Sequence, residues 1–231
     1  MPLPVHLAQD QASGISLQEP VAQFEIGSYR NFVYLILDWD SKKAAVIDPQ
    51  SHLKPLLQSL LTHGFDLSAI LLTHTHFDHI AGLPELHKQF PQIPVYVHSI
   101  DAHRIPSQLA RKLKLEFIQD QQNIPLGTLK IQTLHTPGHS AGECCFRLDA
   151  NRTYLFTGDT IFIRDCGRTD LESGSDAEMF TSIQEIKKLP PETVILPGHH
   201  YKKECASDLQ TELKDSPPFQ CKTIDELANL P

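Results

Sequence analysis

The sequence predicts an α/β fold in which two mixed β-sheets pack face to face and helices cover their outer faces. Short runs of β-branched, aliphatic and aromatic residues occur in two groups, before and after the middle of the chain, with helical patterns interspersed. This mixed order does not fit a simple parallel sheet, whereas two packed sheets with outer helices accommodate it. With 231 residues, of which 40% are hydrophobic, the chain can bury a sizeable core.

The predicted elements of the first half begin with a hairpin, in which strands at 31–37 and 43–48 are joined by a turn at 38–41. Leucines at helical spacing over 53–61 predict a helix, which His63-Gly64 ends. After this helix we expect a strand at 69–72, a helix at 80–90, a strand at 94–98 and a helical, partly basic segment at 99–113.

The second half is predicted to be rich in strands. We expect one helix, at 177–189, which ends at Pro190-Pro191. The expected strands are 115–118, 129–134, 143–148, 153–156 and 193–196.

We interpret residues 1–231 as a single domain. Residues 1–23 have weak periodicity and are expected to form an extended N-terminal arm, with an edge strand as one interpretation. Residues 201–231 are expected to form a polar C-terminal tail that is helical in part and is interrupted at Pro217-Pro218.

Charge and composition exclude several classes of partner. The formal net charge is −8 and no basic stripe is visible, so neither nucleic acid nor an anionic membrane is an expected partner. No apolar run reaches the length of a membrane span, and the first residues lack the pattern of a secretion signal. The five cysteines are odd in number and form no CxxC pair, which favours a reducing compartment, so the expected location is cytoplasmic.

Candidate metal ligands are concentrated directly after the predicted strand at 69–72, where His74, His76, Asp78 and His79 lie within six positions. Side chains alternate between the faces of a strand, so His74 and His76 are expected to project the same way. Imidazole nitrogens and carboxylate oxygens suit a metal such as zinc, and a carboxylate can bridge two metals. A polar loop with incidental histidines is the less favoured alternative.

Three further donors follow predicted strands. His139 follows a Pro-Gly turn, and Asp159 and His199 each come directly after a glycine. Each signal is weak alone, because a glycine beside a histidine or an aspartate is common in turns. Together with the histidine-rich stretch, they place donors at four successive strand ends, where sites on rigid scaffolds are usually built.

The complete set of donors resembles the signature of the metallo-β-lactamase superfamily, over about residues 31–199. The resemblance implies an αβ/βα sandwich with the site at one edge, between the sheets. It also implies two divalent metal ions, zinc or else iron or manganese, with a bridging hydroxide as the nucleophile. By this resemblance one metal is bound by His74, His76 and His139, the other by Asp78, His79 and His199, and Asp159 bridges them.

The segment 163–170 indicates a branch within this superfamily. Its Cys-Gly-Arg triplet resembles glyoxalase II (hydroxyacylglutathione hydrolase) and the persulfide dioxygenases, both of which act on glutathione derivatives. The wider string IRxCGRTD and the closing residues 229–231 are more similar to the dioxygenases, whereas Phe77 and the segment 175–180 are more similar to glyoxalase II. The residues after His199 are too few for the helical glutathione-binding domain of full-length glyoxalase II.

The function that the resemblance implies is a metal-dependent hydrolase in which metal-bound hydroxide attacks a thioester. The expected substrate is a small thiol-derived molecule, first of all a glutathione derivative. Asp78 is expected to be a metal ligand and a proton acceptor, and Tyr201 contacts the substrate or serves in packing. Arg168 either holds an anionic group of the substrate or is a buried structural arginine paired with Asp170, and Cys166 is interpreted as a small buried thiol that packs like alanine.

Two alternative functions use the same fold. In one, a persulfide dioxygenase acts on glutathione persulfide with a single Fe(II) held by His74, His139 and Asp159. In the other, the chain is a non-catalytic metal-binding protein, which is disfavoured because no donor of the signature is missing. A homodimer is an assembly that the sequence leaves open.

The remaining polar residues near the motifs have simpler interpretations. Asp48 either hydrogen-bonds a ligand histidine from behind or caps the turn before a proline. His98 and His135 are interpreted as packed or solvated, although both could lie near the site. His200 is expected to point away from the donor beside it, His199.

Overall fold

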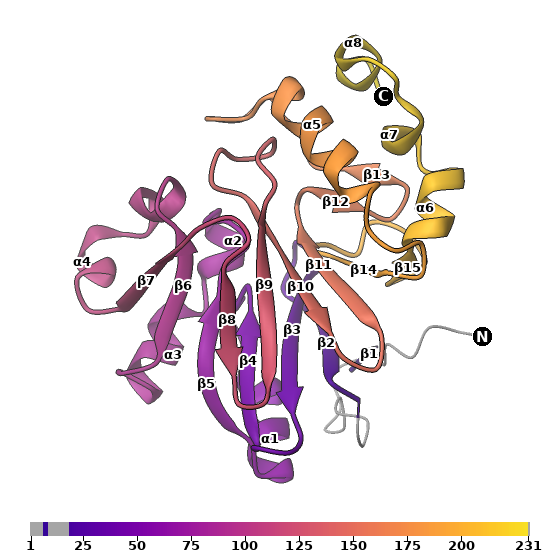
Figure 1. Cartoon of the computed structure of the whole chain (residues 1–231). Helices are drawn as coiled ribbons and strands as arrows, with labels where there is room; N and C mark the ends of the chain where they lie inside the picture. Colours follow the sequence, from indigo (N-terminus) through magenta and orange to yellow (C-terminus); the bar gives the residue numbers. More distant parts are fainter. Residues whose placement is uncertain (1–6, 9–18, 231) are drawn as a thin grey trace.

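The computed structural model describes residues 7–8 and 19–230 of the chain. Two mixed β-sheets pack against each other, and helices lie on both outer faces (Figure 1). The predicted αβ/βα sandwich is therefore confirmed.

The first sheet has seven strands that lie side by side in the order of the chain. Pairing is antiparallel from β2 to β4 and parallel from β4 to β7, and β1 adds a short parallel edge. Its strands are β1 (Leu7–Ala8), β2 (Val21–Ile26), β3 (Asn31–Asp38), β4 (Lys43–Ile47), β5 (Asp66–Leu71), β6 (Pro94–His98) and β7 (Lys114–Ile118).

The second sheet has six strands in the order β15-β14-β11-β10-β9-β8. Only the β11–β14 pair within it is parallel. Its strands are β8 (Asn123–Leu126), β9 (Leu129–His135), β10 (Cys144–Asp149), β11 (Thr153–Gly158), β14 (Val194–Pro197) and β15 (Ser207–Asp208). A small separate ribbon pairs β12 (Ile161–Phe162) with β13 (Asp165–Cys166).

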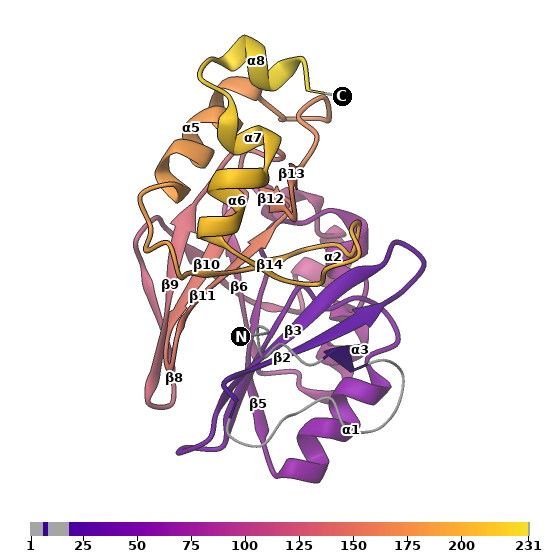
Figure 2. The same ribbon diagram turned by 90° about the vertical axis from the view of Figure 1, so that its right-hand side faces the viewer.

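The helices form two groups, one on each outer face (Figure 2). The first sheet is covered by α1 (Lys54–His63) and α3 (Leu83–Gln89). The second is covered by α5 (Asp176–Ile186), α6 (Leu209–Asp215), α7 (Pro217–Gln220) and α8 (Ile224–Ala228). The remaining helices are short: α2 (Phe77–Ile80), η1 (Asp101–Arg104) and α4 (Ser107–Ala110).

Alternation along the strands builds the core in three apolar layers. On β3, Val33 packs with the helices of the first sheet and Tyr34 packs between the sheets. On β11, Phe156 packs between the sheets, and its neighbour Leu155 packs against the helices of the second sheet. The two-residue period of a strand thus fills both faces of each sheet.

The predicted helix at 80–90 is wrong as a continuous element, because it divides into α2 and α3 around Gly82. The Gly82 N–H donates to the Pro49 carbonyl over 2.7 Å. A Cβ atom at Gly82 would lie 2.6 Å from the Gln50 carbonyl oxygen, so the chain approaches this loop more closely than another residue would allow. Pro84, in the first turn of α3, lacks the N–H that a helix running through it would need.

Other boundaries also differ from the sequence prediction. The helical segment predicted at 99–113 is only η1 and α4, separated at Pro106. β2 begins at Val21, inside the predicted arm, and β8, β12 and β13 were not predicted. The last two of these strands have two residues each, too few to show a period.

The segment 201–230 contributes to the second sheet and to its outer layer. Leu209, Phe219 and Leu227 of α6, α7 and α8 are buried with α5 in one apolar cluster. Pro217 and Pro218 stand in the first turn of α7, so they start one helix as well as ending another. Across the described residues, no helix is both long enough and apolar enough to cross a membrane.

Replacing Tyr34 by phenylalanine tests how the two sheets are joined. The buried Tyr34 hydroxyl donates to the Pro197 carbonyl of β14 over 2.6 Å and accepts from the Gln23 amide at 3.0 Å. Tyr34→Phe is expected to lower the free energy of unfolding in urea by about 1–3 kcal/mol, because buried polar groups lose their partner. The matched control is Tyr154→Phe, whose hydroxyl donates to Asn151 of the adjacent turn over 2.9 Å. Equal losses in the two variants would contradict this role of Tyr34.

Candidate metal centre

The seven predicted donors lie together at one edge of the sandwich. They come from the segment after β5, from α2, and from the segments that follow β9, β11 and β14. Three groups of residues have possible ligand atoms within 4.8 Å of one another. Two consist of predicted donors alone, His74, His76 and His139 in one and Asp78, His79 and His199 in the other, and the third joins Asp48 to His74 and His79.

Asp159 lies between these two groups. One carboxylate oxygen, Oδ2, is 3.5 Å from His139 Nε2 and 3.4 Å from His199 Nε2. The other, Oδ1, is 3.5 Å from His79 Nε2. The carboxylate thus contacts histidines of both groups, which is the position of a bridging ligand.

The expected reason for the convergence of His74 and His76 is wrong, because β5 ends at Leu71 and neither histidine lies in a strand. Hydrogen bonds fix the loop instead. The Thr73 N–H donates to Asp48 Oδ1 over 2.8 Å, and the Thr73 carbonyl accepts from the Cys144 N–H over 2.8 Å. The loop is therefore held between the two sheets.

Hydrogen bonds around Asp48 set the tautomers of two histidines. The Thr73 hydroxyl donates to Asp48 Oδ2 over 2.6 Å, so its oxygen is left to accept from His74 Nδ1, which is 3.1 Å away. His79 Nδ1 lies 3.1 Å from the same carboxylate oxygen and donates to it. In both rings Nε2 faces the cluster, and the Nε2 atom of His74 keeps its lone pair.

Backbone carbonyls set the tautomers of two more. His139 Nδ1 donates to the Arg168 carbonyl over 2.8 Å, and His199 Nδ1 donates to the Tyr29 carbonyl over 2.9 Å. Their Nε2 atoms are therefore also free acceptors. His76 faces the cluster through Nδ1.

This arrangement of acceptors fits metal ions. His76 Nδ1 and His139 Nε2 are 2.9 Å apart, and the Nε2 atoms of His79 and His199 are 3.1 Å apart. Two nitrogen lone pairs at such distances repel, so each close pair needs a proton or a metal ion between its members. Within the described residues, His74 Nε2 and Asp159 Oδ1 are buried without a hydrogen-bond partner. Imidazole and carboxylate donors of this kind suit zinc.

The protonation of the buried groups also suits ligation. Burial lowers the pKa of His74 well below its usual value and that of His76 to about 4, so both rings are neutral at neutral pH. Burial alone would lower the pKa of His79, but Asp159 and Asp48 raise it to about 10. Burial opposes ionisation of Asp159, yet His79 and its neighbours hold its pKa well below the usual range. A cation at His79 therefore replaces a proton.

Two buried residues support the donors and were not predicted. Glu143 Oε1 accepts from the Asp159 N–H over 2.9 Å and lies 3.5 Å from His74 Nδ1. The amide of Asn31 donates to Asp78 Oδ2 over 3.0 Å. The sequence predicts each of them only as the first residue of a strand. The one signal that marks them is a polar side chain at the start of an apolar run.

The other candidate residues have defined contacts. Arg168 pairs with Asp170 over 2.6 Å at the exposed surface, so the ion-pair interpretation is correct but the pair is not buried. Tyr201 stacks on His199 with ring centroids 4.8 Å apart. Burial raises the pKa of Cys166 to about 12, which keeps this partly buried thiol protonated.

The remaining histidines lie outside the two donor groups. His98 and His135 stack on each other with centroids 4.4 Å apart. His200 Nδ1 lies 2.6 Å from a carboxylate oxygen of Glu25, on β2. The stacking agrees with the packed interpretation of His98 and His135, and His200 contacts Glu25, outside the donor groups.

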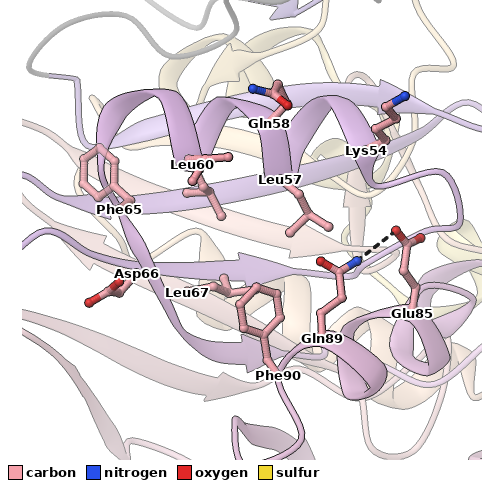
Figure 3. Close-up of a pocket in the computed structure, with 11 residues that line it drawn as sticks. Lys54, Leu57, Gln58, Leu60, Phe65, Asp66, Leu67, Glu85, Gln89 and Phe90 are labelled. Carbon is pink, nitrogen blue, oxygen red and sulfur yellow. Dashed lines mark hydrogen bonds between the residues drawn. The ribbon is translucent and has the colours of Figure 1, made fainter.

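A cavity of about 600 Å³ lies away from the donors, between α1 and α3 (Figure 3). Leu57, Phe65 and Phe90 supply its apolar surface, and Lys54 and Glu85 lie at its rim. None of the seven donors lines it. Size alone therefore does not locate the functional site.

A two-sheet sandwich with clustered histidines and aspartates at its edge defines a class of metal-binding proteins. The family model of the metallo-β-lactamase superfamily matches residues 27–199, and the chain belongs to this superfamily.

Relatives within the superfamily include hydrolases. The protein named Probable polyketide biosynthesis zinc-dependent hydrolase BaeB, from Bacillus velezensis, is 34% identical over 202 residues, which are 87% of each chain. A hydroxyacylglutathione hydrolase of Synechococcus is 34% identical over 74% of this chain, but the match covers only 65% of that enzyme. Among solved structures, ETHE1 from Myxococcus xanthus superposes with a TM-score of 0.77 at 26% identity, covering 91% of this chain and 92% of the other.

Replacing Asp48 by asparagine tests the support behind the donors. Asp48→Asn keeps the shape of the side chain but weakens the acceptor that holds both His79 and Thr73. We expect the affinity of the metal-free protein for Zn²⁺ to fall about 10- to 100-fold in competition with a chromophoric chelator. Asp66→Asn, at an exposed residue of β5, is the control. Unchanged zinc affinity in Asp48→Asn would show that the carboxylate does not orient the donors.

Proposed function

We propose that the chain is a zinc-dependent hydrolase that cleaves thioesters. The observation that carries this proposal is the pair of donor groups with Asp159 between them. In this proposal one ion is held by His74, His76 and His139, the other by Asp78, His79 and His199, and Asp159 contacts both. When bound, the ions supply Lewis acidity and lower the pKa of water, so that hydroxide is available near neutral pH.

The residues of the chain supply proton acceptance and substrate orientation. Asp78 is only partly engaged, since one of its oxygens accepts from Asn31, and it is positioned to take a proton from the attacking water. Burial, together with Asp159 and Asp78, raises the pKa of Tyr201 to about 12. The Tyr201 hydroxyl therefore stays protonated at neutral pH and can donate to a substrate that lies against His199.

The chemistry of the leaving group supports a thioester as the substrate. Hydrolysis adds water to the carbonyl and breaks the C–S bond, which yields a carboxylic acid and a thiol. A thiolate leaves readily because its conjugate acid has a pKa of about 8.5. No strongly acidic group is therefore needed at the leaving sulfur.

Glutathione thioesters are the first candidates, because relatives that are 36% and 34% identical to this chain are named probable hydroxyacylglutathione hydrolase and hydroxyacylglutathione hydrolase. BaeB matches along 87% of its length and is named as a hydrolase of polyketide biosynthesis. It therefore supports hydrolysis as the reaction without favouring glutathione as the thiol. We retain Arg168 as the proposed contact for an anionic group of the substrate. Such a group must compete with Asp170, which is 2.6 Å from the guanidinium.

Steady-state hydrolysis of S-lactoylglutathione by zinc-loaded protein tests this function. We expect turnover that is abolished by a chelator and restored by Zn²⁺. Asp159→Asn is expected to lower kcat/KM by about 100-fold or more, since it weakens the ligand between the ions. Asp66→Asn, a change of the same kind at an exposed residue of β5, is the control for general damage to the fold. A folded protein with full zinc content and no turnover on any thioester would refute the proposal.

A persulfide dioxygenase is the second candidate, favoured by the similarity to ETHE1 and by the segment 163–170. It would use a single iron held by His74, His139 and Asp159. Metal analysis separates the two functions. Two zinc ions per chain without oxygen uptake support the hydrolase, whereas one iron per chain with oxygen uptake on glutathione persulfide supports the dioxygenase. Inertness on every substrate class would leave a non-catalytic metal-binding protein.

A further inference from the structure

A second cavity, of about 370 Å³, opens directly beside the donor cluster. It shares His76 with the first donor group, so a molecule bound in it also contacts the edge of the centre. Its volume is within the range of small-molecule sites. The apolar part of its lining consists of Phe77, Ile80, Ala81, Pro84, Pro106 and Leu109. We name this cavity the acyl groove.

Two segments far apart in the sequence form the walls of the acyl groove. Phe77, Ile80 and Pro84 come from α2 and the start of α3, and Pro106 and Leu109 come from the segment around α4. Phe77 is 64% exposed although it is large and apolar. Its ring meets the ring of Tyr29 edge to face at 5.3 Å, so exposed aromatic surface lies next to the donors. An apolar ligand that covers this surface removes it from water, which is favourable.

The charged residue of the acyl groove is already paired. Arg104 donates to Asp101 over 2.9 Å, to Ser173 Oγ over 2.9 Å and to the Glu172 carbonyl over 3.0 Å. Its charge is thus compensated inside the protein and does not call for a carboxylate in the groove. The groove therefore suits an apolar group.

The side of the centre at the second donor group carries more polar groups. Tyr201 stacks on His199 and also meets Phe162. Lys202, which lies 3.6 Å from Asp165, and Lys203 follow Tyr201 in the chain, and both are exposed. A polar or anionic thiol, such as a peptide thiol, is better matched by this flank. The acyl part of a thioester with its carbonyl at the centre then extends towards His76.

We propose that the acyl groove binds an apolar acyl chain of the thioester, and that the substrates of this chain are thioesters of medium-length aliphatic or aromatic acids. This inference rests on the proposed function and names its substrate class. A short, polar acyl group such as lactoyl leaves the groove unfilled.

The test is kcat/KM of the zinc-loaded protein for glutathione thioesters of lactate, butanoate, hexanoate and octanoate. We expect kcat/KM to rise about 10-fold or more from lactoyl to the longer chains, as added methylene groups are buried. Ala81→Trp places bulk in the groove at an exposed position and is expected to abolish the rise of kcat/KM with chain length. Ala150→Trp, at an exposed turn far along the sequence, is the control.

Two further measurements separate the failure of this inference from the failure of the proposed function. Calorimetric titration of the zinc-loaded protein with octanoate and acetate requires no turnover. Tighter binding of octanoate, lost in Ala81→Trp, supports the groove even if no thioester is cleaved. Thioesters that carry the apolar chain on the thiol side test which end of the substrate lies in the groove. If kcat/KM rises with the length of the thiol chain and not of the acyl chain, the inference is overturned. The inference is also overturned if thioesters are cleaved but kcat/KM does not depend on acyl chain length in either the wild type or Ala81→Trp. In that case the proposed hydrolase function is retained.

Discussion

The close approach of buried acceptors at the edge of the sandwich is the constraint on which the rest of the structure depends. Nitrogen atoms of His79, in α2, and His199, which follows β14, are 3.1 Å apart. Two backbone hydrogen bonds join the sheets at this point, from the Phe32 N–H to the Gly198 carbonyl over 2.8 Å and from the His200 N–H to the Arg30 carbonyl over 2.9 Å. This junction fixes His199 beside the other donors, and a proton or a metal ion between neighbouring nitrogens offsets the repulsion of their lone pairs.

Local signals in the sequence were enough to predict most of the strands and all seven candidate donors. The strand β6 was predicted with its observed bounds, because its residues are β-branched or aromatic and turn formers flank it. The αL conformation of Gly64 ends α1 as the sequence indicates. His139, Asp159 and His199 were found because each follows a strand through a turn, and turn residues are local features.

Features that depend on contacts between distant segments were not predictable in this way. Gly82 breaks a helical pattern only because the loop at Pro49 lies against it. Glu143 reads as the first residue of a strand, and its position behind Asp159 arises from the packing of β10 beside β11. The acyl groove likewise joins α2 and α4, whose apolar residues carry no sign of each other in the sequence.

The central claim is that two metal ions bind side by side, with Asp159 between them. Anomalous diffraction from crystals of the zinc-loaded protein, recorded on both sides of the zinc absorption edge, tests this claim most directly. The account predicts two peaks, one at His74, His76 and His139 and the other at Asp78, His79 and His199, with the Asp159 carboxylate in contact with both. A single peak at full zinc loading, or a peak away from these donors, would contradict it.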